Sequence, residues 1–296
     1  MKKIRLHSDC MSCIARKETE KYSEGITEAQ KLEYKRAVFK ILGNAKNSDS
    51  APLLVKYIAD LQTEMFGNGY DYTETKKYFN DYVMKKIASV EENVFKSEDA
   101  LYRALQYSMT GNYVDFGTPF SVNEEKFDEL IDESKNITFD AKQYASLKND
   151  LYHAKRLVVL LDNCGEIVFD KVLIKALKAF YPSLKITAVV RGFQALNDAT
   201  MEDAKQIGLT EIVKVIGNGT DIAGTVLEHV NAETKKALEE ADVIISKGLG
   251  NFETINGCGL NIYYLFMCKC EMFANRFKKN LYEGLLINEH SVEPLS

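Results

Sequence analysis

Acidic and amide side chains gather at Asp162, Asn163 and Glu166, directly after the apolar run Leu157–Leu161. This run holds two valines and does not alternate with polar residues, which is typical of a parallel strand buried on both faces. Apolar residues then recur at helical spacing up to Pro182. The polar groups are therefore expected at the carboxyl end of a core strand, in the turn before a helix. Open α/β sheets bind their ligands at that edge.

Two further expected strands bring complementary groups to the same edge. Arg191 follows the run Lys185–Val190, and Asp198 comes a few residues later. The run Asp242–Ser246 leads into a glycine-rich turn, whose polar residues are Lys247, Asn251 and Glu253. Oxygen ligands without histidine or cysteine suit a hard divalent ion such as Mg²⁺ or Mn²⁺. The cations and the backbone N–H groups of the glycine turns suit a phosphate. One such residue could be a simple turn former, but three strands together favour a site.

The elements that must position these groups alternate between strands and helices from residue 157 onward. This alternation predicts an α/β fold with a Rossmann-like, mostly parallel sheet and helices on both faces. Strands are expected at residues 157–161, 185–190, 211–216, 242–246 and 283–287. Helices are expected at residues 222–241 and 260–277, and Thr200 is expected to cap a short helix. Neither G-x-G-x-x-G nor a P-loop is present, so the usual nucleotide-binding signatures are missing.

The first half of the chain is predicted to be helical, which divides the protein into a helical subdomain (1–150) and an α/β domain (151–296). The expected helices cover residues 28–42, 51–65, 73–88, 97–109 and 138–152, with Ser97 as the N-cap of the fourth. A polar loop bounded by Gly111 and Gly117 follows the fourth helix and contains Asn112 and Asp115. This loop is either an Asx-type turn between helices or part of the site.

Composition narrows the possible partners. The chain has 296 residues, of which 46% are hydrophobic and 27% charged, with a net charge of −5. A nucleic-acid-binding protein needs a basic face, so this charge argues against nucleic acid as the main partner. No apolar run approaches the roughly 20 residues of a membrane span. Met1–Ser8 is basic but is not followed by the apolar stretch of a signal peptide. We therefore expect a cytoplasmic protein that binds no membrane.

Six cysteines in a chain of this length do not form a disulfide framework. Cys10 and Cys13 form a C-x-x-C pair. A redox role would need a thioredoxin-like setting, and a zinc site would need a second ligand pair. We expect instead a reduced pair packed at the start of a helix. Cys164 lies beside Asp162 with no base near it in sequence, so we expect a small packed side chain rather than a nucleophile.

Together these segments resemble the metal-dependent damage-control phosphatases, long known as domain of unknown function 89, and within them the microbial branch with an N-terminal C-x-x-C. The matching segments, in the family's order, are Cys10–Cys13, Ala51–Pro52, Gly111–Gly117, Leu161–Glu166, Val190–Gly192, Asn197–Thr200, Lys247–Glu253 and Lys269–Cys270. Two departures are Cys164, where alanine is usual, and Phe193–Gln194, which replaces a segment that often carries proline. Neither touches a proposed ligand.

The resemblance implies a helical subdomain packed on a Rossmann-like domain, with the active site in the cleft between them. It also implies a divalent metal ion (Mg²⁺, Mn²⁺, Co²⁺ or Ni²⁺) held by Asp162, Asn163 and Asp198. The implied reaction is hydrolysis of phosphate esters of small metabolites, such as sugar phosphates, nucleotides or damaged phosphometabolites.

The remaining polar residues receive roles by hypothesis. Arg191 and Lys247 would hold the phosphoryl oxygens, and they would do so more tightly in the transition state. The nucleophile is water or the Asp162 carboxylate. Glu166 or Glu253 would serve as general base or supporting group. The expected substrate contacts are Asn112, Asp115 and Asn251.

Two other classes of protein remain open at this point, and so does the oligomeric state. An S-adenosylmethionine-dependent methyltransferase would use the same carboxylates to hold ribose hydroxyls. A non-catalytic phosphometabolite sensor would bind ligand and metal without turnover. A calorimetric titration with S-adenosylmethionine in the absence of metal distinguishes the methyltransferase.

Overall fold

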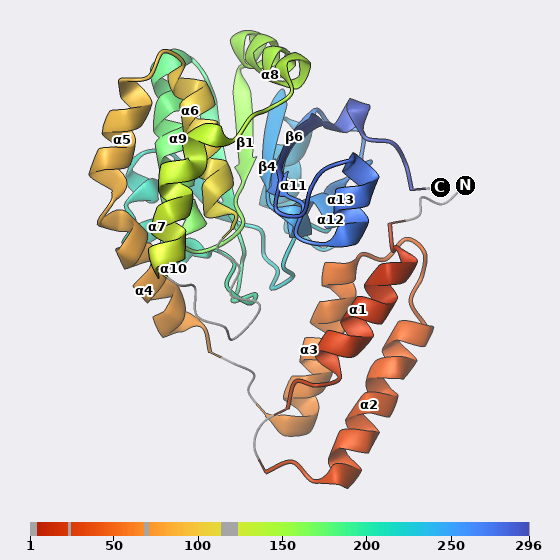
Figure 1. Ribbon diagram of the computed structural model, residues 1–296. Helices are drawn as coiled ribbons and strands as arrows, with labels where there is room; N and C mark the ends of the chain where they lie inside the picture. The colour runs from red at the N-terminus through yellow and green to blue at the C-terminus, as the bar shows by residue number, and fades with distance from the viewer. Residues whose placement is uncertain (1–4, 23–24, 68–70, 114–123, 296) are drawn as a thin grey trace.

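The centre of the molecule is a six-stranded sheet (Figure 1). The computed structural model describes residues 5–22, 25–67, 71–113 and 124–295. The strands are β1 (Arg156–Leu160), β2 (Lys185–Val190), β3 (Lys214–Gly217), β4 (Val243–Lys247), β5 (Ile262–Met267) and β6 (Gly284–Asn288). Their spatial order is β3-β2-β1-β4-β5-β6. The first five strands are parallel and β6 pairs antiparallel with β5. This confirms the predicted α/β fold with a mostly parallel sheet.

Helices precede the sheet in sequence and then alternate with its strands. Those before β1 are α1 (Ser8–Glu18), α2 (Glu28–Gly43), α3 (Ala51–Phe66), α4 (Thr73–Met84), α5 (Ile87–Phe95), α6 (Ala100–Gly111), α7 (Glu124–Glu133) and α8 (Ala141–His153). Those after β1 are α9 (Glu166–Phe180), α10 (Met201–Gln206), α11 (Ala232–Glu239), α12 (Leu249–Ile255) and α13 (Glu271–Phe277). Short 3₁₀ turns lie at Ser134–Asn136, Leu209–Glu211 and Glu289–Ser291.

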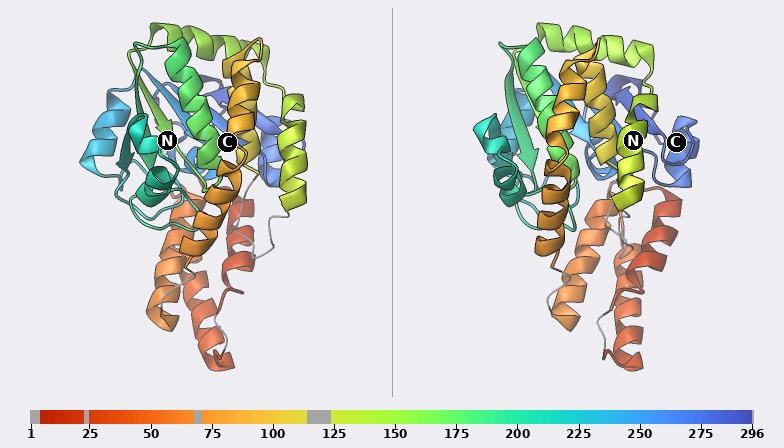
Figure 2. Two further views of the ribbon diagram at one scale, coloured as in Figure 1. Left: turned by 90° about the vertical axis from the view of Figure 1, so that its left-hand side faces the viewer. Right: turned by 60° about the vertical axis from the view of Figure 1, so that its left-hand side comes forward.

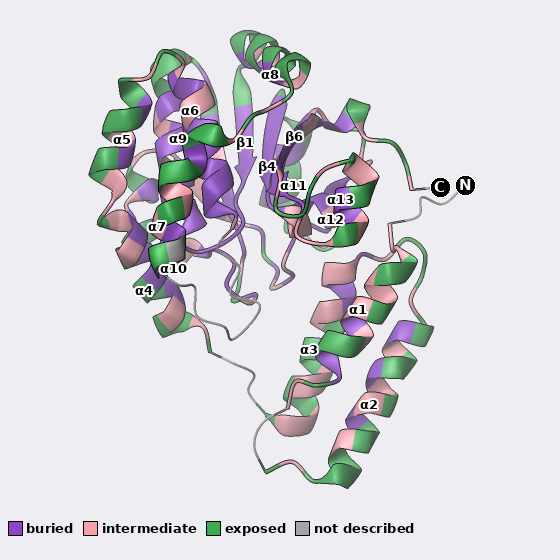
Figure 3. Ribbon diagram, in the orientation of Figure 1, coloured by how far each residue is buried: buried purple, intermediate pink, exposed green. Residues whose placement is uncertain are grey.

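Each face of the sheet has its own hydrophobic core, which explains why the strands read as unbroken apolar runs. Val159 and Ile245 point to the face covered by α5, α6 and α9. Val158 and Ile244 point to the opposite face, where they pack with Phe252 of α12 and with α13. The central strands β1 and β4 are coloured as buried along most of their length in Figure 3. A strand that is buried on both sides needs apolar residues at every position.

Helices α1 to α3 form a separate three-helix unit with a core of its own, centred on Tyr34, Val38 and Ile58. Figures 1 and 2 show this unit beside the main body. Leu53 of α3 packs on Ile222 and Val226, which lie in the loop after β3. The three-helix unit therefore adjoins the edge of the sheet at which the parallel strands end. Helices α5 and α6 share the core of the sheet, and the boundary near residue 150 stays a prediction.

Several expected elements were wrong. Residues 260–277, expected as one helix, form β5 and then α13. The run Ile262–Met267 is fully buried, and an apolar run with no polar face has no periodicity that separates strand from helix. Of the expected helix 222–241 only α11 forms, and the expected helix 73–88 is divided between α4 and α5. The third strand starts at Lys214 rather than Glu211, because residues 209–211 form a 3₁₀ turn.

The cap of α6 also differs from the expectation. Asp99, rather than Ser97, is its N-cap, and the Asp99 carboxylate accepts a hydrogen bond from the Tyr102 N–H at 3.0 Å. Both residue types satisfy an unpaired N–H group of the first turn. Thr200, in contrast, is the N-cap of α10 as expected. In the described part of the chain, no helix is both long enough and apolar enough to cross a bilayer.

Candidate functional site

The register of the sheet places three polar loops at one level. Leu160 of β1 pairs with Val189 of β2 and with Ser246 of β4. Two residues beyond these partners come Asp162, Arg191 and Gly248. The strand order reverses its direction between β1 and β4, and this topological switch point is where doubly wound sheets bind ligands.

Backbone hydrogen bonds join the loop after β1 to the loop after β2. The Ala199 N–H donates to the Asp162 carbonyl at 2.7 Å, and Asn163 forms an antiparallel bridge with Asp198. The second loop is held in turn at Thr200, whose N–H donates to the Asp203 carboxylate at 2.7 Å. These contacts bring Asp198 beside Asp162 and Asn163, although it lies 35 residues further along the chain than Asn163.

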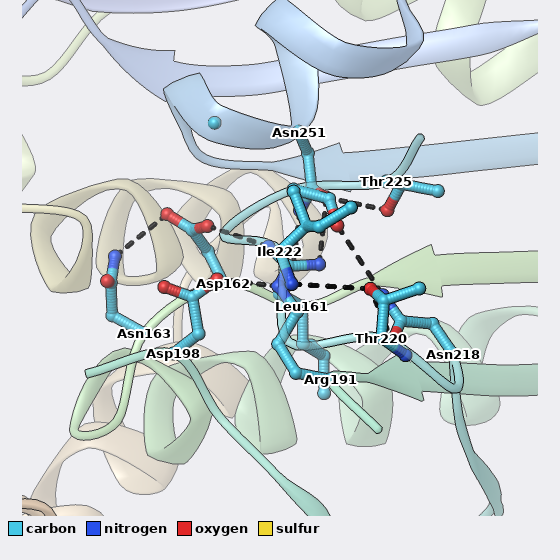
Figure 4. A network of polar contacts seen from close by, with 12 residues as sticks. Leu161, Asp162, Asn163, Arg191, Asp198, Asn218, Thr220, Ile222, Thr225 and Asn251 are labelled. Carbon is cyan, nitrogen blue, oxygen red and sulfur yellow. Dashed lines mark hydrogen bonds and ion pairs between the residues drawn. The ribbon is translucent and has the colours of Figure 1, made fainter. Parts of the chain in front are cut away.

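The Arg191 guanidinium connects the two carboxylates of the site (Figure 4). Its Nε donates to Asp198 Oδ2 at 2.5 Å, and its Nη2 donates to Asp162 Oδ1 at 3.3 Å. Its Nη1 donates to the Asn251 amide oxygen at 3.0 Å. Arg191 is only 1% exposed. It therefore positions the site from within the protein, and this differs from the expected direct grip on a phosphate.

The second oxygen of Asp162 faces two carboxamides. Asn163 Nδ2 lies 2.8 Å from Asp162 Oδ2 and 2.9 Å from Glu166 Oε2. Asn112, at the end of α6, donates to Glu166 at 3.0 Å and more weakly to Asp162 at 3.4 Å. The structure thus brings together Asp162, Asn163, Asp198 and Glu166, as the sequence predicted. Asn112, expected as a substrate contact, is buried and donates to Glu166.

Lys247 has a different role from the one expected for it. Its Nζ contacts Glu166 Oε1 at 2.6 Å, Asp170 Oδ1 at 2.9 Å and the Ser108 carbonyl at 2.9 Å. These three acceptors use all three ammonium N–H donors, and the side chain is fully buried. In this structure its donors are therefore directed at protein oxygens, and the expected contact with a phosphate stays a prediction. Lys247 holds Glu166, which in turn orients the two carboxamides.

The pKa shifts of the buried acids indicate an excess of negative charge in the site. Burial, the Asp198 carboxylate and the Glu166 carboxylate together raise the pKa of Asp162 well above its usual value. Burial likewise raises the pKa of Asp170 to about 6. Burial would also raise the pKa of Glu166, but the Lys247 charge and the hydrogen bonds from Lys247, Asn112 and Asn163 together lower that pKa. Four buried carboxylates therefore share two buried cations.

A hard divalent cation fits this donor set. Asp162, Asn163 and Asp198 offer oxygen donors from two loops, and a cation there would relieve the excess of negative charge. No three His, Cys, Asp or Glu side chains are arranged to hold a metal in the described ranges. The third donor to such a cation would therefore be the Asn163 carboxamide, whose oxygen accepts a hydrogen bond from Asn197 Nδ2 at 2.9 Å in this structure.

The other expected site residues lie outside the acidic cluster or outside the described residues. Asn251 is fully buried and donates to the Leu161 carbonyl at 3.0 Å, so it supports the first loop. Asp115 lies outside the described residues. Glu253 is half-buried on α12, and the charge of Lys17 on α1 lowers its pKa. Cys164 is fully buried and burial raises its pKa, which is the environment of a packed thiol.

Several residues of the site were missed from the sequence. Asp170 follows Glu166 by four residues, so it lies on the same face of α9, and an acid among apolar residues was the available signal. Asn80 of α4 accepts a hydrogen bond from the Gly165 N–H at 2.7 Å and holds the first loop. Lys269 belongs to a segment that the sequence analysis matched to the family, but it was given no role. It lies just after β5, is half-buried and is close enough to lower the pKa of Asp162.

Comparisons with known proteins show the family and the fold of this chain. Residues 6–285 match the family model described as the damage-control phosphatase ARMT1-like domain. A damage-control phosphatase of Pyrococcus horikoshii is 29% identical over 93% of this chain and 95% of its own. One of Archaeoglobus fulgidus is 32% identical over 80% of this chain and 83% of its own. The crystal structure of a DUF89 family protein from Pyrococcus horikoshii superposes with a TM-score of 0.77 at 25% identity, over 96% of this chain and 99% of that one.

Gly248 is predicted to be irreplaceable for a steric reason. A Cβ atom there would lie 1.8 Å from Asp162 Oδ2, and its φ is +75°. Gly259 has a similar φ of +82° but no atom within 4 Å of such a Cβ. Both Gly→Ala variants should lose about 1–3 kcal/mol of unfolding free energy through backbone strain. Gly248→Ala should lose clearly more in urea denaturation, and equal losses would contradict the close packing of Asp162.

Glu253 is predicted to make stability depend on pH. Burial raises its pKa from 4.5 to about 8, against the opposing effect of Lys17. The folded protein then binds a proton that the unfolded chain has released, so stability falls as pH rises from 4.5 to 8. In urea denaturation, Glu253→Gln should gain stability relative to the unchanged protein across this range. The exposed Glu239→Gln should not, and parallel profiles for all three proteins would refute the assignment.

Proposed function

We propose that this chain, which belongs to the damage-control phosphatase ARMT1-like family, is a metal-dependent phosphatase acting on phosphate esters of small metabolites. The observation that carries the metal dependence is the buried cluster of Asp162, Asn163 and Asp198 at the switch point of the sheet. Its relatives from two archaea bear the name damage-control phosphatase, which supports the reaction type.

The two carboxylates and the carboxamide are the residues that would hold the metal ion. Oxygen donors suit Mg²⁺ and Mn²⁺, and the resemblance to the family adds Co²⁺ and Ni²⁺ as candidates. When bound, such an ion supplies Lewis acidity that neutralises the phosphoryl charge as the P–O bond breaks. The chain itself keeps the donors in place: Arg191 fixes the two carboxylates, and Lys247 fixes Glu166.

The cation that contacts the substrate is best assigned to Lys269. Arg191 and Lys247 are both buried and engaged with carboxylates. Lys269 follows β5, is half-buried, and acts electrostatically on Asp162. An ammonium at this place is suited to a phosphoryl oxygen, because both would lie at the same rim of the sheet. Glu166, whose pKa is lowered, stays ionised and orients Asn163 and Asn112.

Metal removal is the first test of this function. After thorough chelation, hydrolysis of an aryl phosphate should fall by at least about 10²-fold and return when one of the four ions is added. The same ion should raise the thermal unfolding temperature of the unchanged protein but not of Asp162→Asn. Turnover that survives chelation rules the proposal out. Calorimetry with S-adenosylmethionine and no metal detects the methyltransferase instead, and metal binding without turnover of any phosphate ester identifies a sensor.

Lys269 can be tested separately. Lys269→Met should lower kcat/KM by roughly 10²- to 10³-fold, because one preorganised charge typically contributes that factor. Metal binding, followed by thermal shift, should persist because no proposed metal donor is removed. The exposed Lys235→Met on α11 is the matched control for a lost positive charge. Unchanged kinetics in Lys269→Met would assign the phosphate contact to another group.

A further inference from the structure

Three thiols and one carboxyl group meet where α1 faces α12 and α13. Cys10 and Cys13 lie on α1, Cys270 immediately precedes α13, and all three are free and half-buried. Glu253 on α12 acts electrostatically on both Cys10 and Cys270, and Cys13 also acts on both. These groups come from three elements that are distant in sequence, so the fold rather than the local sequence assembles them.

Independent contacts locate the same junction. Arg5, just before α1, donates from Nη1 to the Thr254 carbonyl at the end of α12, at 2.9 Å. A cavity of about 720 Å³ is lined on one side by residues 6–9 and on the other by residues of α13, among them Met272 and Arg276. In Figure 1 the start of α1 lies next to α12 and α13. The C-x-x-C pair therefore lies at the contact between the three-helix unit and the main body.

The two thiols of α1 are placed to react with each other. Residues three apart share one face of a helix, with Cβ atoms about 5–6 Å apart. A disulfide needs a Cβ separation of about 3.5–4.5 Å. Cys10 lies in the first turn of α1, which begins at Ser8. The cap residue His7 holds this turn, because its carbonyl accepts from the Cys10 N–H at 3.0 Å and its Nδ1 accepts from the Asp9 N–H at 3.1 Å. Closing the bond therefore shifts the capped end of the helix and not its interior.

The surroundings of the two thiols differ in a way that suits a stepwise reaction. Cys13 lines a shallow depression of about 260 Å³ together with Asp9, Ser12 and Arg16, so small molecules can reach it. Burial, followed by the Glu253 carboxyl, raises the pKa of Cys10 to about 12. Cys10 therefore keeps its proton and needs a base. Among the described residues, no hydrogen bond to the Glu253 carboxyl contributes to its pKa.

We propose that Cys10 and Cys13 form a dithiol–disulfide site that reacts with low-molecular-weight disulfides, with Glu253 as the base for Cys10. Cys13 attacks the external disulfide and forms a mixed disulfide, and the first small thiol leaves with the Cys13 proton. Cys10 then attacks the Cys13 sulfur, Glu253 takes the Cys10 proton, and this proton passes to the second departing thiolate. One S–S bond is made and one is broken. The protein dithiol is oxidised and the small disulfide is reduced to two thiols.

A zinc site in the same place is the less favoured assignment. In the part of the chain that the structure describes, no three His, Cys, Asp or Glu side chains are arranged to hold a metal. Glu253 has a pKa of about 8, close to the working pH of an effective general base. Cys10 and Cys13 also share one face of α1, and Arg5, just before α1, contacts α12, the helix that carries Glu253. This placement supports disulfide closure rather than coordination.

The experiment incubates the full-length reduced protein with mixtures of reduced and oxidised glutathione, blocks the remaining thiols by alkylation and maps the bonds by mass spectrometry. A Cys10–Cys13 disulfide should form first, while Cys258, also half-buried and free, stays alkylated. Cys258→Ser and Cys270→Ser should leave this disulfide unchanged. Cys10→Ser should stop at the glutathione adduct on Cys13. A pair that stays reduced in fully oxidised glutathione, or that links Cys10 to Cys270 instead, overturns the proposal.

The role of Glu253 has its own readout. The rate at which the mixed disulfide closes should rise up to a pH of about 8. Glu253→Gln should slow this closure by roughly 10²-fold at that pH, which is the lower range of general-base effects. The first step at Cys13 and the final extent of oxidation should remain unchanged. Equal closure rates in the unchanged protein and Glu253→Gln would show that Glu253 is not the base. The dithiol itself is tested by the mapping of the disulfide bonds.

Discussion

The contact on which the candidate site depends is that of Arg191 with Asp162 and Asp198. Taking carboxylates out of water costs several kcal/mol each unless a partner compensates them, and here the carboxylates and the guanidinium are almost completely buried. Each buried cation serves two acids: Arg191 holds the pair on the two loops, and Lys247 holds Glu166 and Asp170. The acids still outnumber the cations, so the fold stores negative charge at the switch point of the sheet. A divalent ion would balance that charge.

This arrangement divides the positive groups between two tasks. Arg191 and Lys247 have their donors directed at protein oxygens, so their contribution is the fixed orientation of the acidic and amide groups. Preorganised groups of this kind do not have to rearrange when charge develops on a substrate. The proposed contact with a phosphoryl group is therefore assigned to Lys269, which is half-buried and acts electrostatically on Asp162. In this proposal the supporting charges and the substrate-binding charge lie at different depths of the same edge.

Much of the fold and the identity of the central site residues could be predicted from the sequence, because parallel strands end at a common edge. Asp162 and Arg191 each follow an apolar run, so their meeting follows from the sheet alone. Depth could not be predicted: nothing in the local sequence separates the fully buried Lys247 from Lys269, since burial is set by α6 and α9. Residues 260–277 were assigned wrongly for a related reason. A strand covered on both faces lacks the alternation by which a strand is recognised.

The junction between the three-helix unit and the main body is weak compared with the interior of the sheet. It rests on the small apolar cluster of Leu53, Ile222 and Val226 and on partly exposed polar contacts such as that of Lys56 with Asp221 at 3.0 Å. Exposed ion pairs contribute about 0–1 kcal/mol, whereas both faces of the sheet are fully packed. The proposed disulfide would close in the first turn of α1, beside this junction and close to Cys270 and the neighbouring Lys269. The proposed dithiol and the proposed phosphate contact therefore adjoin the same junction between the three-helix unit and the main body.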